Sequence, residues 1–224
     1  MTKDLRFDPQ TYAVKQYMLD GIEVRCRAFE DIPYCAAPAD PIQKLNLYVP
    51  ADYYAGAQHN GYTLHTAPIF MPNTVGGYLP GPADCPGPDR FGRPNAVLCA
   101  LAHGYVVACV GVRGRTSGHR NTEFFEGSKT MAQQKETGRS VGKAPAFAVD
   151  MKAGIRWLRK NRALIPGDPE KIITSGTSAG GRPLRSDRRQ RQQPAVCRRS
   201  GQDRRRRGAG RHFRRQLLLP HPQS

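Results

Sequence analysis

Residues 14–50 alternate between apolar and polar positions with the two-residue period of β-strands. Within them, YMLDGIEVRCRAF places Asp20 and Gly21 between two alternating runs, which predicts a hairpin with an Asp-Gly turn. A third run, KLNLYVP (44–50), also alternates and ends at a proline. We therefore expect the chain to begin with a series of strands.

The pattern changes after residue 65, where three segments have longer apolar runs. TAPIFMPNTVGG (66–77) is an apolar strand that enters a glycine loop, and YVVACVGV (105–112) is a continuous apolar run, typical of a strand covered on both faces. PNAVLCALAHG (94–104) predicts a short helix, with Pro94 at the first helical position and Gly104 at the carboxyl-terminal cap.

The segment APAFAVDMKAGIRWLRKN predicts an amphipathic helix, because Phe147, Met151, Ile155 and Leu158 recur at helical spacing. Residues 113–143 before it are polar and predict a long surface excursion. KIITSG (171–176) after it predicts another buried strand. Strands alternating with helices predict right-handed crossovers, and hence an α/β fold with a mostly parallel sheet and flanking helices.

Composition places few limits on this interpretation. The chain has 224 residues, enough for one domain with a sizeable core. The first 15 residues are charged and polar, unlike a signal peptide, and no apolar run approaches the ~20 residues of a membrane span. The six cysteines show no metal-binding spacing. We expect a cytoplasmic protein with no membrane contact and no metal site.

The positive charge is concentrated at one end of the chain. Residues 1–181 carry 21 Lys and Arg against 16 Asp and Glu, whereas residues 182–224 carry 14 Arg, no Lys and two Asp. The overall net charge of +17 therefore describes the tail more than the globular sequence.

Candidate chemistry lies directly after the last predicted strand. Gly176-Thr177-Ser178-Ala179-Gly180 fits G-x-S-x-G, the sharp strand-to-helix turn that exposes a nucleophilic serine. The backbone N–H of Ala179 then suits the oxyanion that forms on the attacked carbonyl. A second donor would come from the loop at Gly76 and Gly77, after an earlier strand. The alternatives are a phosphate-binding or structural glycine turn at Ser178 and an ordinary turn at Gly76–Gly77.

Four collinear segments resemble bacterial tannases, the gallate-ester hydrolases of the α/β-hydrolase fold: APIFMPNTVGGYLPGPAD, GYVVACVGVRGRT, VGKAPAFAVDMKAGIRWL and IPGDPEKIITSGTSAGG. The resemblance covers nearly all of residues 40–181. It implies Ser178 as the nucleophile of a serine esterase, Gly77 as an oxyanion donor beside Ala179, a small phenolic ester as substrate, and no cofactor. Residues 117–141 are longer than the family pattern, so esterases acting on ferulate or other phenolic acids remain an alternative.

The partners of Ser178 are not recognisable in this sequence. In this fold the triad follows the chain order Ser, Asp or Glu, then His, so acid and base should lie well past residue 178. The candidates there are Asp187, Asp203, His212 and His221, and none is assigned. The resemblance implies that acid, base and most gallate-contacting groups lie in a C-terminal half that this chain lacks.

Residues 182–224 do not match the helix that should follow the motif. Residues 182–212 show no apolar periodicity, and Arg204–Arg207 could not be buried unpaired. We divide the chain into residues 1–181, the N-terminal part of an α/β-hydrolase domain, and residues 182–224, an Arg-rich tail without structure. The alternative function is a non-catalytic basic protein whose tail binds nucleic acid, although residues 1–181 offer no motif for it.

A reading-frame shift near Gly181 and Arg182 accounts for this change. Codons can be chosen for residues 182–193 that, after removal of the first base, encode Ala-Leu-Ser-Ala-Leu-Ile-Gly-Ala-Asn-Gly-Asn-Ser, a small apolar helix of the kind the motif needs. The same frame at residues 212–221 permits Ile-Phe-Ala-Ala-Ser-Cys-Tyr-Cys-Pro-Ile, which also resembles tannases.

Sequencing the coding DNA from codon 175 past codon 224 tests this hypothesis. We expect the neighbouring frame to encode both segments and to continue with a tannase-like sequence. A gene whose neighbouring frame yields neither segment would refute the frame shift.

Overall fold

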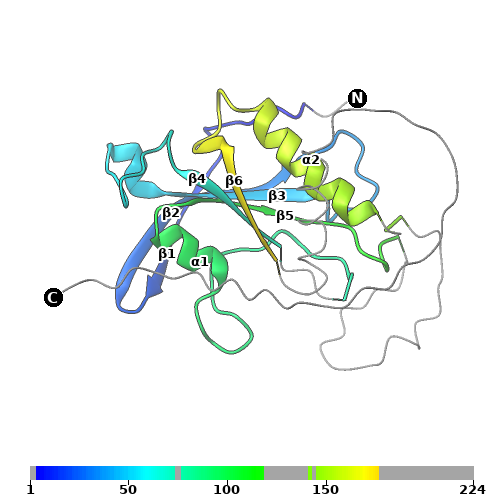
Figure 1. The fold of residues 1–224 in the computed structure, drawn as a ribbon, viewed down its shortest axis with the longest axis horizontal. Helices are drawn as coiled ribbons and strands as arrows, with labels where there is room; N and C mark the ends of the chain where they lie inside the picture. The colour runs from blue at the N-terminus through cyan, green and yellow to red at the C-terminus, as the bar shows by residue number, and fades with distance from the viewer. Residues whose placement is uncertain (1–3, 74–76, 119–140, 143–144, 177–224) are drawn as a thin grey trace, which may run out of the picture. The chain divides into compact units, whose positions relative to one another are not determined.

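The computed structural model describes residues 4–73, 77–118, 141–142 and 145–176 (Figure 1). All of them belong to one compact unit, and the second unit, Gln193–Ser224, falls wholly outside them. Most of the surface excursion predicted at residues 113–143 and the tail at 182–224 lie outside the described residues. At the described ends of the predicted excursion the prediction is wrong in part, because Gly114, Ser117 and Gly142 are buried. The described elements are, in chain order, β1 Ala13–Leu19, β2 Ile22–Pro33, β3 Lys44–Pro50, the 3-10 helix η1 Ala51–Ala55, β4 Pro68–Asn73, α1 Ala96–Ala102, β5 Val106–Val110, α2 Ala146–Lys160 and β6 Asp168–Gly176.

The six strands form one sheet in the order β1-β2-β3-β5-β4-β6. The β1–β2, β2–β3 and β3–β5 pairs are antiparallel, while β4 pairs in parallel with both β5 and β6. The prediction of a mostly parallel sheet is therefore wrong: the sheet is mixed. Crossovers through α1 and α2 make the later strands parallel, whereas the two-residue turn at Asp20 and Gly21 can only join antiparallel neighbours.

Two helices cover opposite faces of the sheet (Figure 1). Val106, Ala108 and Val110 of β5 lie in one buried cluster with Met151 and Leu158 of α2. The intervening β5 residues, Val107 and Cys109, lie in a second cluster with α1. Successive side chains of a strand point to opposite faces, so the uninterrupted burial of β5 follows from this double cover, as its continuous apolar run predicts.

Helix α1 confirms the predicted short helix with one shift at its start. The Asn95 side chain caps it by accepting a 2.9 Å hydrogen bond from the Leu98 N–H, so Pro94 lies before the cap and not at the first helical position. Gly104 adopts φ +82° just beyond the end of the helix, as the predicted cap requires. Helix α2 buries Phe147, Met151 and Leu158 as predicted, and the fourth predicted residue, Ile155, is half-buried against the same cluster.

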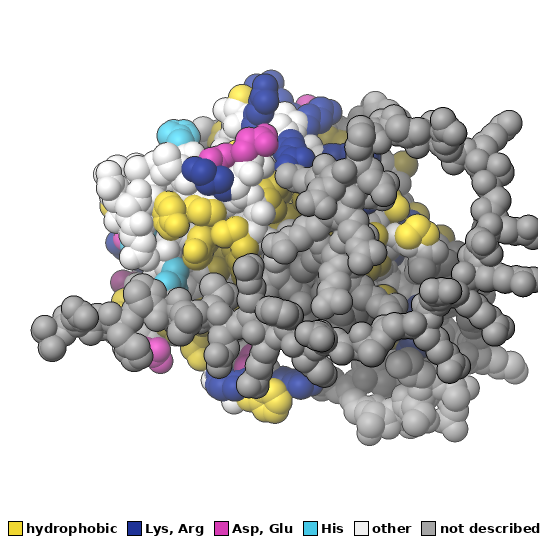
Figure 2. Space-filling model, in the orientation of Figure 1, with side chains coloured by type: hydrophobic (Ala, Val, Ile, Leu, Met, Phe, Trp, Pro, Cys, Tyr) yellow, Lys and Arg dark blue, Asp and Glu magenta, His cyan; other side chains and the backbone are white. Residues whose placement is uncertain are grey.

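Strand β6 departs from the prediction of a buried strand. In the described sheet it lies at the edge and pairs only with β4. Its residues 172–176 alternate between half-buried and exposed, and Pro169 near its start is buried. Ile173 of β6 exposes 45% of its surface. Exposed hydrophobic side chains also occur beside charged ones elsewhere on the face of the molecule shown in Figure 2. The apolar run of β6 does not distinguish a strand covered on both faces from one at an edge.

Among the helices in the described ranges, none is long and apolar enough to cross a membrane.

Two glycines with the same backbone conformation provide a test of the packing that leads into β6. Gly167 (φ +85°) has Ile69 and Val106 side-chain atoms and the Ala67 carbonyl within 3.2 Å of the place its β-carbon would occupy, whereas Gly21 (φ +80°) has open space. We expect Gly21→Ala to cost about 1–2 kcal/mol of unfolding free energy through φ alone. Gly167→Ala should cost roughly 1–3 kcal/mol more through overpacking. Equal losses in urea titrations would contradict this packing.

Candidate active site

Along the chain, the residues predicted to form the site follow the carboxyl ends of β4 and β6, two of the three parallel strands. Strand β4 leads through α1 to β5 on one side, and β5 leads through α2 back past β4 to β6 on the other. The direction of the chain thus reverses about β4, and in open α/β sheets the crevice at such a point, beyond the carboxyl ends of the strands, is where ligands bind.

The register of β4 and β6 aligns the ends of the two strands that the predicted residues follow in the chain. Asn73, the last residue of β4, is the parallel partner of Gly176, the last residue of β6. Gly77 follows Asn73 by four positions, and Ser178 follows Gly176 by two. The structure therefore brings together the starting points of the two loops. Gly77 is described, whereas Ser178, Ala179 and Gly76 lie outside the described residues.

Gly77 begins a turn of unusual backbone conformation. Gly77 has φ +57° and Tyr78 has φ +59°, two consecutive residues in the left-handed region. A residue with a β-carbon is strained there, at a cost of roughly 1–2 kcal/mol, and Tyr78 is 38% exposed, so burial does not compensate for it. The backbone N–H of Arg115 donates a 2.8 Å hydrogen bond to the Tyr78 carbonyl and holds the turn.

The segment after β5 supports the same loop along its length. Gly81 and Val112 exchange two backbone hydrogen bonds of 3.0 and 2.8 Å. A β-carbon on Gly114 would lie 2.2 Å from the Leu79–Pro80 peptide, and one on Gly142 would lie 1.6 Å from the Gly114 carbonyl oxygen. Three stretches of backbone thus stack with no room for side chains between them, which the sequence pattern did not indicate.

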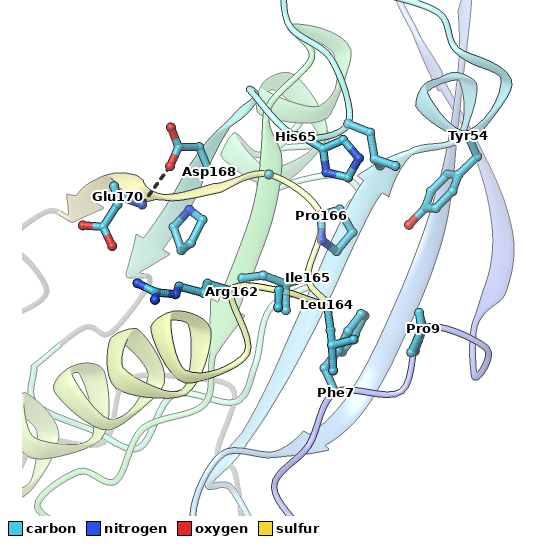
Figure 3. A pocket seen from close by; sticks show the side chains of 14 residues that line it. Phe7, Pro9, Tyr54, His65, Arg162, Leu164, Ile165, Pro166, Asp168 and Glu170 are labelled. Carbon is cyan, nitrogen blue, oxygen red and sulfur yellow. Dashed lines mark hydrogen bonds between the residues drawn. The ribbon is translucent and has the colours of Figure 1, made fainter.

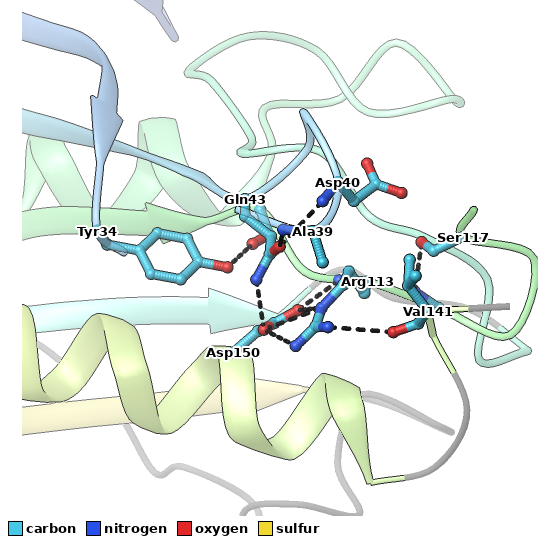
Figure 4. Close-up of polar contacts among 10 residues, drawn as sticks. Tyr34, Ala39, Asp40, Gln43, Arg113, Ser117, Val141 and Asp150 are labelled. Carbon is cyan, nitrogen blue, oxygen red and sulfur yellow. Dashed lines mark hydrogen bonds and ion pairs between the residues drawn. The ribbon is translucent and has the colours of Figure 1, made fainter. Parts of the chain in front are cut away.

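A buried ion pair connects this stack to helix α2 (Figure 4). The Arg113 guanidinium donates to both carboxylate oxygens of Asp150, at 2.7 Å from Nη2 and 2.9 Å from Nε. Gln43 Nε2 donates to the same carboxylate at 2.9 Å. Hydrogen bonding to Asp150 raises the pKa of Arg113, and burial raises the pKa of Tyr34, whose hydroxyl donates to the Gly111 carbonyl nearby. Apolar periodicity gives no signal for these polar residues, so the sequence pattern did not indicate them.

The chain is similar in sequence and fold to several solved structures. Over 81% of its length the chain is similar to a tannase from Fusobacterium nucleatum, with 42% identity and a TM-score of 0.70. It is similar over 80% of its length to a tannase from Lactobacillus plantarum (44% identity, TM-score 0.67) and to a tannin acyl hydrolase solved with ethyl gallate (44%, 0.68). This part of the chain is tannase-related. It spans 35%, 35% and 36% of those three proteins. Models of protein families and curated protein sequences give no match.

The described histidines of the tannase-related chain lie away from the carboxyl ends of the strands. His59 and His65 precede β4 and His103 precedes β5, so all three lie at the amino ends. A six-residue strand is about 20 Å long, far beyond the reach of a general base. His59 lies 3.5 Å from Asp52, and His103 ends helix α1, as its sequence indicates. Asp187, Asp203, His212 and His221, which follow Ser178 in the chain and were assigned no role, lie outside the described residues.

A cavity of about 470 Å³ also lies at the amino ends of β4 and β6 (Figure 3). Its lining is mostly apolar, with charged groups at the rim: Phe7, Tyr54, His65, Arg162, Leu164, Pro166, Asp168 and Glu170. A hydrogen bond from Lys171 lowers the pKa of Asp168. The cavity is at the opposite end of β6 from Gly176, so it is not the predicted active site. Within the described ranges, no group of three or more His, Cys, Asp or Glu could hold a metal ion.

The close backbone packing at Gly114 predicts that alanine substitutions at Gly114 and Gly87 differ in their effect on the free energy of unfolding. Neither glycine has a positive φ. Gly114→Ala forces a β-carbon into backbone, whereas Gly87→Ala enters open space. We expect Gly114→Ala to cost more than about 3 kcal/mol, above the usual range for overpacking. Gly87→Ala should change the unfolding free energy by less than about 1 kcal/mol. Thermal and urea unfolding of both variants measure this, and a tolerated Gly114→Ala would refute the close stacking.

Proposed function

We propose that the chain carries part of the active site of a tannase-type serine carboxylic-ester hydrolase. Its substrates are galloyl or similar phenolic-acid esters, cleaved through an acyl-serine intermediate. The parallel register of Asn73 with Gly176 supports the proposal, because these paired residues precede Gly77 by four positions and Ser178 by two. The identity of 42–44% with solved tannases supports it.

In the proposed reaction Ser178 Oγ attacks the ester carbonyl, and its proton passes to a histidine that a carboxylate orients. Negative charge moves to the carbonyl oxygen, where the backbone N–H groups of Gly77 and Ala179 donate hydrogen bonds. The tetrahedral intermediate collapses, the histidine protonates the leaving alcohol, and the acyl-serine remains. Water, deprotonated by the same histidine, then releases the acid and restores Ser178. No cofactor takes part.

The proposed substrate class is based on the molecules bound in solved structures of related proteins. One solved tannin acyl hydrolase holds ethyl gallate and another holds 3,4-dihydroxybenzoate. Both molecules are hydroxylated benzoic acid derivatives, so a galloyl ester is the first substrate to test. Ferulate esters are the second, because the length of residues 117–141 leaves the substrate preference open.

We expect the 224-residue chain itself to hydrolyse methyl gallate at least about 10³-fold more slowly than an intact serine hydrolase. The reason is that neither histidine after Ser178, His212 or His221, is recognisable as the triad base, and loss of that base costs several powers of ten. Gallate release can be followed by chromatography. Turnover at an ordinary enzymatic rate would show that this chain contains a working base.

Restoring the proposed frame tests the nucleophile directly. We expect that deletion of the first base of codon 182 yields a protein that hydrolyses methyl gallate, and that Ser178→Ala in it lowers kcat by roughly 10⁶-fold. Ser175→Ala, three residues earlier on β6, is the matched control and should retain activity, since this side chain is exposed and lies before the turn. Activity that survives Ser178→Ala would rule out the acyl-serine route.

A further inference from the structure

The Asp150 carboxylate of helix α2 accepts hydrogen bonds besides those from the Arg113 guanidinium. Asp150 accepts the backbone N–H of Arg113 at 2.8 Å in addition to the guanidinium, and Gln43 at 2.9 Å. The side chains are 15% and 1% exposed. The carboxylate is therefore buried and the guanidinium is mostly buried. The carboxylate has several donors to satisfy it, which a buried charge requires.

The proposed reaction does not use this pair chemically, because buried side chains so fully engaged with each other are not free to contact a substrate. Their connection to the site runs through the backbone of residues 112–115. Arg113 lies between Val112, which bonds Gly81 in both directions, and Arg115, whose N–H holds the Tyr78 carbonyl. Fixing Arg113 thus fixes the segment that keeps Tyr78 in its left-handed conformation, and Gly77 directly precedes Tyr78.

A second set of contacts attaches the same segment on its other side. Arg113 Nη1 donates to the Val141 carbonyl at 3.1 Å, and the Val141 N–H donates to the Ser117 carbonyl at 3.0 Å. Ser117 Oγ accepts the Gly114 N–H at 3.1 Å. One guanidinium therefore connects helix α2, the segment after β5 and Val141 (Figure 4). A lysine has one ammonium group without the planar fork, so it cannot make all these contacts at once.

We propose that Arg113 and Asp150 are positioning residues that orient the Gly77 backbone N–H, acting through the hydrogen bonds of residues 112–115 to the Tyr78–Gly81 turn. The catalytic meaning of this orientation rests on the proposed function, in which Gly77 is an oxyanion donor. The mechanical connection does not depend on that function, so the two can be tested separately.

Amide hydrogen exchange in the isotopically labelled full chain tests the connection. In Arg113→Lys we expect the amides of Gly81, Val112 and Arg115 to exchange at least about tenfold faster than in the wild type, as local opening of the turn requires. The amides of Val106–Val110 measure global stability and should change less. The Gly77 amide resonance should also shift. Asp150→Asn, which keeps the size of the side chain, should act in the same direction.

The matched control is Arg93→Lys. Arg93 also donates from Nε and Nη2 to an aspartate, Asp89, but its side chain is 69% exposed. An exposed pair contributes little, so we expect its substitution to change the exchange of the three amides by less than about twofold.

A measurement on the wild-type chain covers the case in which the variants do not fold. In native-state exchange at increasing urea, we expect the amides of Gly81, Val112 and Arg115 to open as one unit with a common urea dependence. Independent opening of the three amides would overturn the proposal. The proposal would also be overturned if, in Arg113→Lys, the exchange of the Gly81, Val112 and Arg115 amides increased no more than that of the Val106–Val110 amides, which report global stability. If the connection holds but the frame-restored enzyme does not need Ser178, only the proposed function fails.

Discussion

Strand β4 is hydrogen-bonded to two parallel neighbours, and the arrangement of the rest of the described site depends on this pairing. Because β5 and β6 run in the same direction on either side of β4, all three strands end at one edge of the sheet. The pairing also requires a crossover helix on each face, which is why α1 and α2 each bury one side of β5. A one-residue slip of β6 would exchange its faces and separate Gly176 from Asn73.

The turn at Gly77 is stabilised from outside, not by its own residues. Tyr78 occupies a strained conformation, and its carbonyl partner belongs to the segment after β5. That segment is in turn held by Asp150 from helix α2 and packed through Gly114 and Gly142, where backbone meets backbone. Strain of this kind persists only where surrounding structure over-determines it, and such positions cluster at functional sites. The same helix therefore covers the sheet and supports the loop that the proposed chemistry uses.

Apolar periodicity was sufficient to predict the elements but not their mutual arrangement. It gave β3, β5 and α2 correctly, and Asp20-Gly21 indicated the hairpin. It did not predict a mixed sheet, because parallel or antiparallel pairing depends on connections and not on the run itself. It also did not predict the exposure of β6, since an edge strand and a central strand can share one apolar pattern. Arg113, Gly114 and Asp150 were missed because their roles arise between segments far apart in the sequence.

We propose that the register of β4 and β6 brings the backbone N–H of Gly77 to Ser178, the proposed nucleophile. Nuclear Overhauser effects in the labelled chain measure this most directly. The account predicts a contact between the Gly77 amide proton and the β-protons of Ser178, together with contacts between Asn73 and Gly176. Contacts at Asn73 and Gly176 without one between Gly77 and Ser178 would contradict it, because the strands would then be in register while the loops diverge.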